Sequence, residues 1–485
     1  MIPFRHLHIP GLIYATLLAA VPAIAADTSM TCFSATAAAA ARRTACGIIA
    51  DDPSLAPAVR ANALAARAEM SARENHITDA LKDYDTVIAL TPQDSSALMA
   101  RGRLREATGD DRGAIADYSA ALANNVALSD AYKRRGALRL KSNNQAMIEA
   151  AAIDLGAAHR LNPTDLATDQ LLGTAQLRDN RNAEAAATFD VILATKPDDV
   201  DALRGHGTAL GRTEDYAEAI ADFDHLLRLH PDDTAALKAR GVANLQAGKF
   251  QPAVDDFTTL LAASQDDVEA QFFRATARFR MGDMAGAESD FDIVLAKRPK
   301  DPDALAGRAL VRITNGQLTE GEADFTAALT AAPQAGALLA DRGELRVLRG
   351  DYAGAVQDLT AAMATSAASP DIAAWRFIAE RHSSGDAARN LTAARKTFAA
   401  TGSNDRWPMP VIRYFLGEIT AADLMARAGD STALRSLAAY AIGQNALIHN
   451  DRTTAKQYFM TASETEARGS FAFIGAKIEL VKLAK

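Results

Sequence analysis

The stretch DALRGHGTALGRTEDYAEAIADFDHLLRLHP, residues 201–231, decides the fold of this chain. The segment Gly211-Arg212-Thr213 marks the end of a first helix, and residues 216–229 read as a second helix. Pro231 stops the second helix, because proline cannot donate the backbone hydrogen bond that a continuing helix needs. The stretch therefore predicts two short helices and two turns.

The same pattern returns with a period of 34 residues. Small, aromatic and proline positions keep one common register along most of the chain. The prolines are Pro163, Pro197, Pro231, Pro299 and Pro333. The glycines are Gly102, Gly136, Gly173, Gly207, Gly241 and Gly343. The aromatic residues are Tyr84, Tyr118, Phe189, Phe223, Phe257, Phe291 and Phe325. Such agreement predicts an array of repeated helix pairs.

One helix pair cannot bury its apolar face alone, so neighbouring pairs must stack. Gly207 lies in the middle of a helix, where glycine costs about 0.5–1 kcal/mol relative to alanine. Its recurrence predicts a close approach of the neighbouring helix, and Ala219 is small for the same reason. Phe223 is the large apolar residue that fills the space between adjacent repeats.

These residues resemble the tetratricopeptide repeat, which has small residues at its eighth and twentieth positions, an aromatic at the twenty-fourth and proline at the thirty-second. Gly207, Ala219, Phe223 and Pro231 match that pattern. The resemblance implies an all-α fold, a right-handed superhelical solenoid of stacked helix-turn-helix units. It covers residues 61–369 as nine repeats, some of them degenerate: Leu155 and Leu359 replace the aromatic and Gln265 a proline.

Length and composition agree with a repeat array. The chain has 485 residues, which exceeds the ~250–300 residues at which single cores stop growing. Hydrophobic residues make up 49% of it, which excludes bulk disorder, and aromatics only 6%, which suits close-packed helices. The formal net charge of −8 argues against a globally basic nucleic-acid binder.

Residues 1–25 read as a secretory signal peptide. An apolar run over residues 11–21 is followed by Ala23-Ile24-Ala25, a small-residue cleavage site. The run is shorter than the about 20 apolar residues that a membrane-spanning helix needs. No cysteine stands at the cleavage site, so no lipid anchor is expected there. We expect export to the periplasm; an uncleaved anchor is the alternative.

Residues 26–60 form an N-terminal capping segment with the two cysteines of the chain, Cys32 and Cys46. An even pair in an exported protein predicts a disulfide. One continuous helix would separate the pair by ~21 Å, so the chain near Cys32 must turn back along the helix that carries Cys46. A redox pair is the alternative, although the C-x-x-C spacing is absent.

The pattern changes after residue 369. Residues 370–435 read as a degenerate helical pair and a Trp-Pro segment, and residues 436–485 as a final repeat with a capping helix over 471–483. The segment resembles the C-terminal part of NlpI-like bacterial tetratricopeptide proteins, which are envelope adaptors for peptidoglycan hydrolases. The resemblance rests on Trp407, Pro408, Pro410, Val411, Ile412, Tyr414, Leu416, Gly417 and Thr420. The chain departs from that family in lacking its lipidation cysteine and in having more repeats.

Motifs for catalysis or metal binding are missing from the sequence. No H-E-x-x-H, G-x-S-x-G or phosphate-binding loop occurs, so we expect no enzyme activity, metal or cofactor. The histidines after the signal are expected in turns or on the surface. Carboxylate pairs such as Asp255-Asp256 and Asp290-x-Asp292 recur with the repeat, which favours a solvated helix face over acid/base catalysis. Phe272 and Phe273 are expected to pack between repeats.

The resemblance puts the fifth, ninth and thirteenth positions of each repeat on a concave groove. Basic residues gather at these positions: Lys133, Lys141, Arg178, Arg204, Arg212, Lys238 and Arg280. Acids at the same positions are nearly confined to the ends, Glu69 and Glu344. Such a strip would attract carboxylates, which arginine binds through two parallel hydrogen bonds. Alternatively, basic residues simply favour these positions because they meet the helix dipole.

These features predict a periplasmic, non-catalytic adaptor that holds acidic peptide segments or other envelope proteins in its groove, in envelope or peptidoglycan maintenance. We expect no nucleic-acid partner and no stable membrane insertion after signal cleavage. Two alternatives stay open. One is a scaffold for exopolysaccharide secretion, with an anionic glycan in the groove. The other is an envelope hydrolase with an unrecognised site in residues 407–420.

Overall fold

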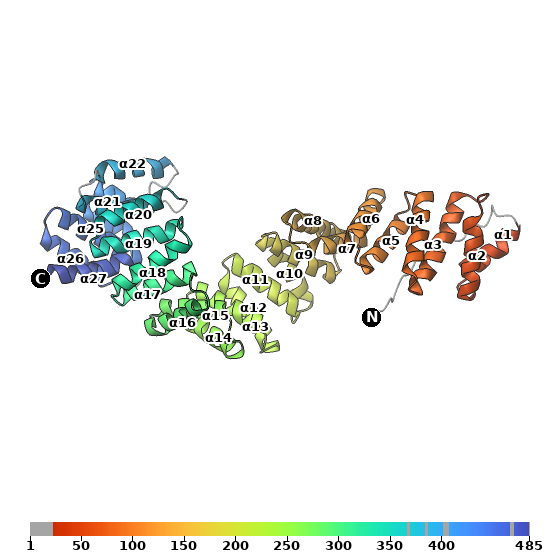
Figure 1. Cartoon of the computed structure of the whole chain (residues 1–485), viewed down its shortest axis with the longest axis horizontal. Helices are drawn as coiled ribbons and strands as arrows, with labels where there is room; N and C mark the ends of the chain where they lie inside the picture. Colours follow the sequence, from red (N-terminus) through yellow and green to blue (C-terminus); the bar gives the residue numbers. More distant parts are fainter. Residues whose placement is uncertain (1–22, 366–368, 384–386, 401–406, 466–469, 485) are drawn as a thin grey trace. The chain divides into compact units, whose positions relative to one another are not determined.

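The computed structural model describes residues 23–365, 369–383, 387–400, 407–465 and 470–484. Every regular element in these ranges is an α-helix (Figure 1), which confirms the all-α repeat solenoid. The predicted signal peptide lies almost wholly outside the described residues. No described helix is long and apolar enough to cross a membrane.

The chain divides into two compact units, and the N-terminal unit extends to Asp232. Its helices are α1 (Ala23–Phe33), α2 (Ala39–Asp51), α3 (Pro57–Arg73), α4 (Ile77–Leu90), α5 (Ser95–Ala107), α6 (Asp111–Asn124), α7 (Ser129–Leu140), α8 (Gln145–Leu161), α9 (Leu166–Arg178), α10 (Asn182–Thr195), α11 (Val200–Arg212) and α12 (Tyr216–Leu229). From α3 onward these helices form successive pairs. We call the members of each pair its first and second helix.

The C-terminal unit begins at Asp233 and continues the pairs as far as α20. Its helices are α13 (Thr234–Gln246), α14 (Phe250–Ala263), α15 (Val268–Met281), α16 (Met284–Lys297), α17 (Pro302–Thr314), α18 (Leu318–Ala331), α19 (Gly336–Arg349), α20 (Tyr352–Met363), α21 (Pro370–His382), α22 (Ala387–Ala400), α23 (Met409–Phe415), α24 (Ala421–Ala428), α25 (Thr432–Ile448), α26 (Arg452–Ser463) and α27 (Phe471–Leu483).

Close packing within each pair explains the periodic glycines. A Cβ atom at Gly207 would lie 2.9 Å from the ring of Phe223, and one at Gly241 would lie 2.9 Å from the ring of Phe257. Both distances are shorter than an ordinary carbon–carbon contact, so a side chain at either position would force the ring to shift. The rings themselves are 2% and 0% exposed, as the repeat pattern predicts.

Aspartates before the first helices set where those helices begin. The side chain of Asp199 accepts a hydrogen bond from the backbone N–H of Ala202 at 3.1 Å. Asp301 caps α17 in the same way through Ala304, also at 3.1 Å. Such caps satisfy backbone donors that a helix start leaves unpaired, which is worth about 1 kcal/mol each.

At the N-terminal end, Cys32 and Cys46 form a disulfide with their Cα atoms 4.8 Å apart. The chain turns back between α1 and α2, so the two cysteines approach across a helix pair. The predicted bridge and the predicted reversal of the chain are both confirmed.

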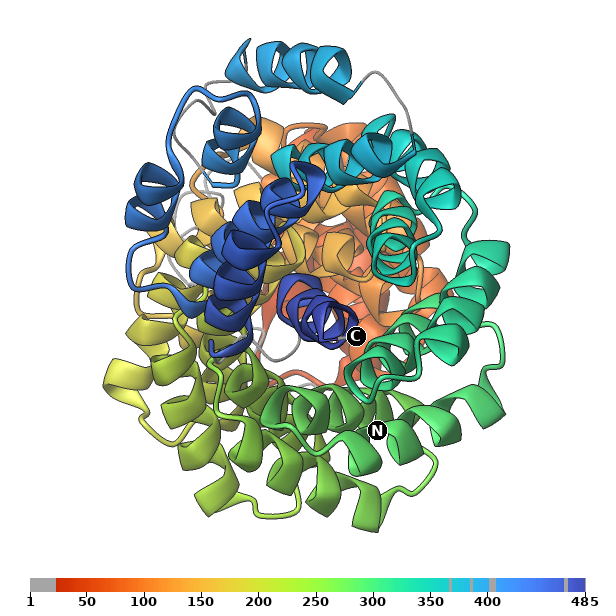
Figure 2. The ribbon, with the colours of Figure 1, turned by 90° about the vertical axis from the view of Figure 1, so that its left-hand side faces the viewer.

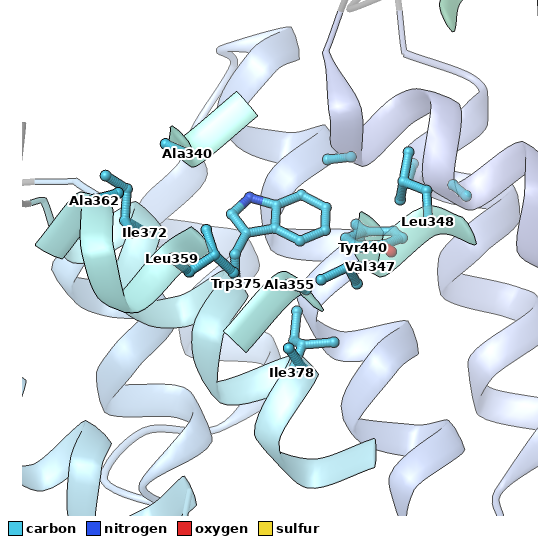
Figure 3. Packing of buried hydrophobic residues seen from close by; sticks show 14 of the residues in the cluster. Ala340, Val347, Leu348, Ala355, Leu359, Ala362, Ile372, Trp375, Ile378 and Tyr440 are labelled. Atoms are coloured by element: carbon cyan, nitrogen blue, oxygen red, sulfur yellow. The ribbon is translucent and has the colours of Figure 1, made fainter. Parts of the chain in front are cut away.

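The last helix has contacts that the sequence did not predict. α27 packs against α25 and α26, and also against α19 far upstream in the chain. In Figure 2 the dark blue α27 lies on the inner side of the arc that the green and cyan helices of the C-terminal unit form. A large apolar cluster fills this region (Figure 3), in which Trp375 and Tyr440 have ring centroids 5.1 Å apart.

Candidate functional site

The seven predicted groove residues all lie on or directly after first helices. Lys133 lies within α7, Arg204 within α11 and Lys238 within α13. The other four lie in or just after a last turn, where the helix leaves carbonyl oxygens without partners: Lys141, Arg178, Arg212 and Arg280. These side chains make three kinds of contact, with carboxylates, with carbonyl oxygens and with an aromatic ring.

The three lysines bind carboxylates of a neighbouring repeat. The Nζ of Lys133 donates to Asp165 at 2.7 Å, and the Nζ of Lys141 donates to Asp111 at 2.9 Å. Lys238 pairs with Glu269. These pairs neutralise the charges of the lysines, so the lysines contribute little positive potential to a groove.

Two arginines instead bind carbonyl oxygens. The guanidinium of Arg178 donates to the carbonyl oxygens of Leu140 and Ser142, the latter at 2.7 Å. The guanidinium of Arg212 donates to the carbonyl of Leu177 at 2.8 Å. Each therefore caps the first helix of the preceding repeat.

Carbonyl partners leave the charge of a guanidinium uncompensated. Within the described ranges, no carboxylate lies at ion-pair distance from Arg178 or Arg212. Their side chains lie one repeat period apart on α9 and α11, and Arg212 is exposed. The negative ends of the helix dipoles stabilise both charges at these places.

Arg204 and Arg280 differ from that pair. Arg204 donates to Asp201 on its own helix at 3.0 Å. The guanidinium carbon of Arg280 lies 5.7 Å from the ring centroid of Phe250, a cation–π contact with the preceding second helix. The seven residues thus occupy corresponding parts of their repeats. They differ in how far neighbouring carboxylates neutralise their charge.

A second set of charged residues forms periodic pairs that the repeat pattern did not predict. An arginine directly before the small residue of the first helix binds an aspartate directly before the large residue of the second helix. The pairs are Arg67–Asp83, Arg101–Asp117, Arg135–Asp154, Arg240–Asp256, Arg274–Asp290, Arg308–Asp324 and Arg342–Asp358. We call these the Arg–Asp pairs. Their constant spacing, 16 residues in six of the seven, is a signal that the sequence already contains.

The Arg–Asp pairs correct the expectation for the recurring carboxylates. Asp256 and Asp290 are only 4% and 1% exposed, so they do not lie on a solvated face. Only their neighbours Asp255 and Asp292 face solvent. The prediction that this periodicity is structural holds, but the prediction of a solvated face is wrong for Asp256 and Asp290. Each of them can be buried because an arginine neutralises it from within its repeat.

His206 replaces the arginine in its repeat and corrects the expectation of surface histidines. Its Nδ1 lies 2.7 Å from Oδ2 of Asp222, and its Nε2 lies 3.3 Å from Oδ1 of Asp190 in the preceding repeat. The hydrogen bond with Asp222 raises the pKa of His206, with help from the charges of Asp222, Asp190 and Glu218, although burial opposes the increase. The imidazole therefore joins two repeats as the arginines do elsewhere.

Carboxyls at the far end of the array lack such partners. Glu344 and Asp341 on α19 and Asp371 on α21 have no hydrogen bond or ion pair among the described residues. Burial and the charges of Asp371 and Asp341 raise the pKa of Glu344 well above its usual range. Burial raises the pKa of Asp341 to about 6 and that of Asp371 to about 6. This end of the array therefore gains negative charge as the pH rises.

The structure also shows the surroundings of Phe272, Phe273 and Trp407. The rings of Phe272 and Phe273 contact those of Phe291 and Phe257 at 5.9 and 5.7 Å, as expected for packing between repeats. In the segment proposed for a hydrolase, the indole N–H of Trp407 donates to the carbonyl of Arg427 at 3.0 Å. No group of His, Cys, Asp and Glu side chains in the described part of the chain could hold a metal ion.

Comparison with protein families gives four matches to the tetratricopeptide repeat model, over residues 64–127, 204–268, 245–302 and 274–336. These segments are tetratricopeptide repeats, as the residue pattern predicts. No curated protein was found to match the chain.

Solved structures of repeat proteins are similar to parts of the chain. A tetratricopeptide repeat protein from Parabacteroides merdae is 21% identical, with a TM-score of 0.44, over 51% of this chain and 97% of its own. Yeast Tom70 is 12% identical, with a TM-score of 0.40, over 87% and 95%. YrrB, described as a TPR protein with an unusual peptide-binding site, is 18% identical, with a TM-score of 0.36, over 39% and 95%.

Proposed function

We propose that this tetratricopeptide repeat protein is a non-catalytic adaptor that binds acidic segments of partner proteins along its first helices. Repeat arrays of this kind present extended surfaces built from equivalent positions of successive repeats. A partner segment can therefore contact several repeats at once.

The observation that supports an acidic partner is the uncompensated charge of Arg178 and Arg212. Both guanidiniums are oriented by carbonyl oxygens rather than neutralised by carboxylates. Each retains donors that no carbonyl uses, because a guanidinium has five N–H groups. A carboxylate that approaches α9 and α11 would accept hydrogen bonds from these remaining N–H groups. Hydrogen bonds between charged groups are stronger than those between neutral groups.

The test compares two double variants of the full chain. Arg178→Gln with Arg212→Gln removes both charges but keeps a donor for the capped carbonyls. Arg160→Gln with Arg228→Gln removes the same charge from exposed positions on the second helices α8 and α12. The probe is a fluorescein-labelled deca-glutamate, and its affinity is measured by fluorescence anisotropy at low and high salt.

The first double variant should bind the probe about tenfold more weakly, which corresponds to ~1.4 kcal/mol. The second should bind nearly as the parent does, because its charges lie away from the proposed surface. High salt should weaken binding by the parent, since salt screens exposed charges. Equal affinities of the two double variants would refute the assignment to α9 and α11.

We further propose that the adaptor works in the bacterial periplasm, in envelope or peptidoglycan maintenance. The disulfide between Cys32 and Cys46 supports an oxidising compartment. The signal-like residues 1–25 and the NlpI-like residues 407–420 support the same setting. A fusion of alkaline phosphatase to the full chain should be active only with residues 1–25 present. Activity without them would refute export.

A further inference from the structure

One column of residues runs through the first helices of the C-terminal unit at the repeat spacing. It consists of Leu245 on α13, Phe279 on α15, Ile313 on α17 and Val347 on α19, each 34 residues after the last. Ile313 and Val347 are only 1% and 3% exposed. Leu245 and Phe279 occupy the equivalent positions, yet both are only half-buried. The same apolar face is therefore covered in one part and open in another.

The helix α27 is one of the elements that cover the buried part. Its Phe471 and Ile474 pack against the cluster that contains Ile313 and Leu345. A Cβ atom at Gly475 would lie 2.7 Å from Cδ2 of Leu348, so the backbone of α27 approaches α19 closely. The first-helix face of this unit thus accepts an α-helix, with small residues at the closest approach and large apolar residues on either side.

The open part has the same chemistry. Val242 and Leu245 on α13 pack partly against the cluster around Phe257. Phe272 and Phe279 on α15 pack partly against the cluster around Phe291. The helices α13 and α15 are neighbours, and so are α15 and α17. The four side chains therefore continue the face on which α27 lies.

We propose that Val242, Leu245, Phe272 and Phe279 form a docking surface for an amphipathic α-helix of a partner protein, beside the stretch that α27 covers. The proposal rests on the adaptor function above and names the kind of partner for the C-terminal unit. The fit follows from α27, which buries the small residues Ala472, Gly475 and Ala476 and approaches α19 closely at Gly475. A partner helix with small residues at its closest approach would fit such a surface in the same way.

The charge at the edge of this surface favours an acidic flank on the partner helix. Arg280 follows Phe279, is exposed, and stacks on Phe250. No carboxylate among the described residues pairs with it. A glutamate on the partner helix, next to its apolar face, would therefore find a cation whose charge is not yet neutralised.

The experiment uses the full chain and a fluorescein-labelled synthetic peptide with the sequence of α27, residues 470–484. Thr276→Arg introduces a long charged side chain between Phe272 and Phe279 without removing apolar packing. Thr259→Arg is the matched control, because it makes the same change on the exposed side of the second helix α14. Both threonine hydroxyls donate to a carbonyl of their own helix, at 3.0 and 2.9 Å.

We expect the peptide to bind the parent and the Thr259→Arg protein equally and the Thr276→Arg protein at least tenfold more weakly. Hydrogen exchange should slow in α13 and α15 on binding. Three results would overturn the proposal: no binding to the parent, equal binding to both variants, or faster exchange in α27, which would mean that the peptide replaces it. A dimer that Thr276→Arg converts to a monomer would assign the surface to a second copy and also overturn it.

The outcome is separable from the adaptor proposal. Thr276→Arg leaves Arg178 and Arg212 unchanged, so binding of deca-glutamate to the N-terminal unit should persist in this variant. Loss of peptide binding with deca-glutamate binding intact supports the docking surface. Failure of deca-glutamate binding in the parent counts against the acidic-segment proposal alone.

Discussion

Arg308 binds Asp324 of its own repeat and Asp292 of the preceding repeat at the same time. Its Nη2 lies 2.7 Å from Oδ1 of Asp324, and its Nη1 lies 2.7 Å from Oδ1 of Asp292. Arg312 contacts the other oxygen of Asp324 at 2.8 Å. One buried carboxylate thus holds two arginines in place. Both arginines also link adjacent repeats, because the Nε of Arg312 donates to Glu288 of the preceding repeat at 3.0 Å.

Removing the buried carboxylate should destabilise the C-terminal unit strongly. Asp324→Asn leaves Arg308 and Arg312 without their common counter-charge, and breaking a buried pair costs about 3–5 kcal/mol. The exposed Glu320→Gln on the same helix should cost less than ~1 kcal/mol. Urea denaturation followed by circular dichroism measures both. A loss below ~1 kcal/mol for Asp324→Asn would contradict the role given to the Arg–Asp pairs.

The contact of His206 with Asp222 and Asp190, which links two repeats, should weaken as the pH rises. Because its folded pKa is raised above the ordinary value of about 6.5, protonated His206 stabilises the folded state. That contribution is fully present below about pH 6.5 and is lost as the pH rises through the raised folded pKa. Thermal unfolding between pH 6 and pH 9 should show this loss.

The control for this contact is His206→Arg, which introduces the residue type found in the seven Arg–Asp pairs. Its charge does not titrate in this range, so the decline in stability between pH 6 and pH 9 should become smaller. A decline of equal size in the parent and the variant would show that other groups cause it.

The buried carboxyls of α19 and α21 should make the free energy of unfolding depend on pH in a second, lower range. The folded pKa values of Asp341 and Asp371 are raised to about 6, and burial also raises the pKa of Glu344 well above its usual range. Protonation of these groups therefore favours folding, and the stability present below about pH 4 is lost as the pH rises through the folded values.

Glu344→Gln keeps the shape of the side chain and removes its charge. The variant should match the parent near pH 4 and exceed its stability at pH 7 to 8, as measured by urea denaturation at each pH. Glu320→Gln serves again as the control and should follow the parent throughout. A Glu344→Gln protein less stable than the parent at pH 8 would contradict the assignment.

The disulfide should stabilise the N-terminal end. Cys32 and Cys46 are 14 residues apart, and closing a loop of about 15 residues contributes ~3 kcal/mol by restricting the unfolded chain. Serine at both positions should lower the free energy of unfolding by about that amount. The parent in excess reductant should behave like the double variant, and an unchanged parent under those conditions would argue against the bridge.

The repeat pattern predicted the fold because each of its signals is local. Gly207 and Phe223 lie 16 residues apart, and their contact requires only that one helix pair forms. The Arg–Asp pairs have the same spacing and could have been found as a further periodic signal. The relevant observation is that Arg308 and Asp324 each directly precede a periodic core residue, Ala309 and Phe325.

Other features could not be predicted because they depend on how repeats meet. The contact of Arg178 with the carbonyl of Leu140 spans 38 residues and requires adjacent first helices in a particular orientation. The packing of Ile474 near Ile313 joins segments about 160 residues apart in the chain. The periodicity of the sequence does not specify which distant segments come into contact. The packing of α27 against α19 could therefore not be predicted from it.

Hydrogen exchange of the full chain with and without deca-glutamate tests the central claim most directly. Binding by Arg178 and Arg212 should slow exchange in the first helices α9 and α11 and leave their partner helices α10 and α12 nearly unchanged. Slowed exchange confined to α10 and α12, or no change anywhere in the N-terminal unit at saturating probe, would contradict the claim that these arginines receive an acidic segment.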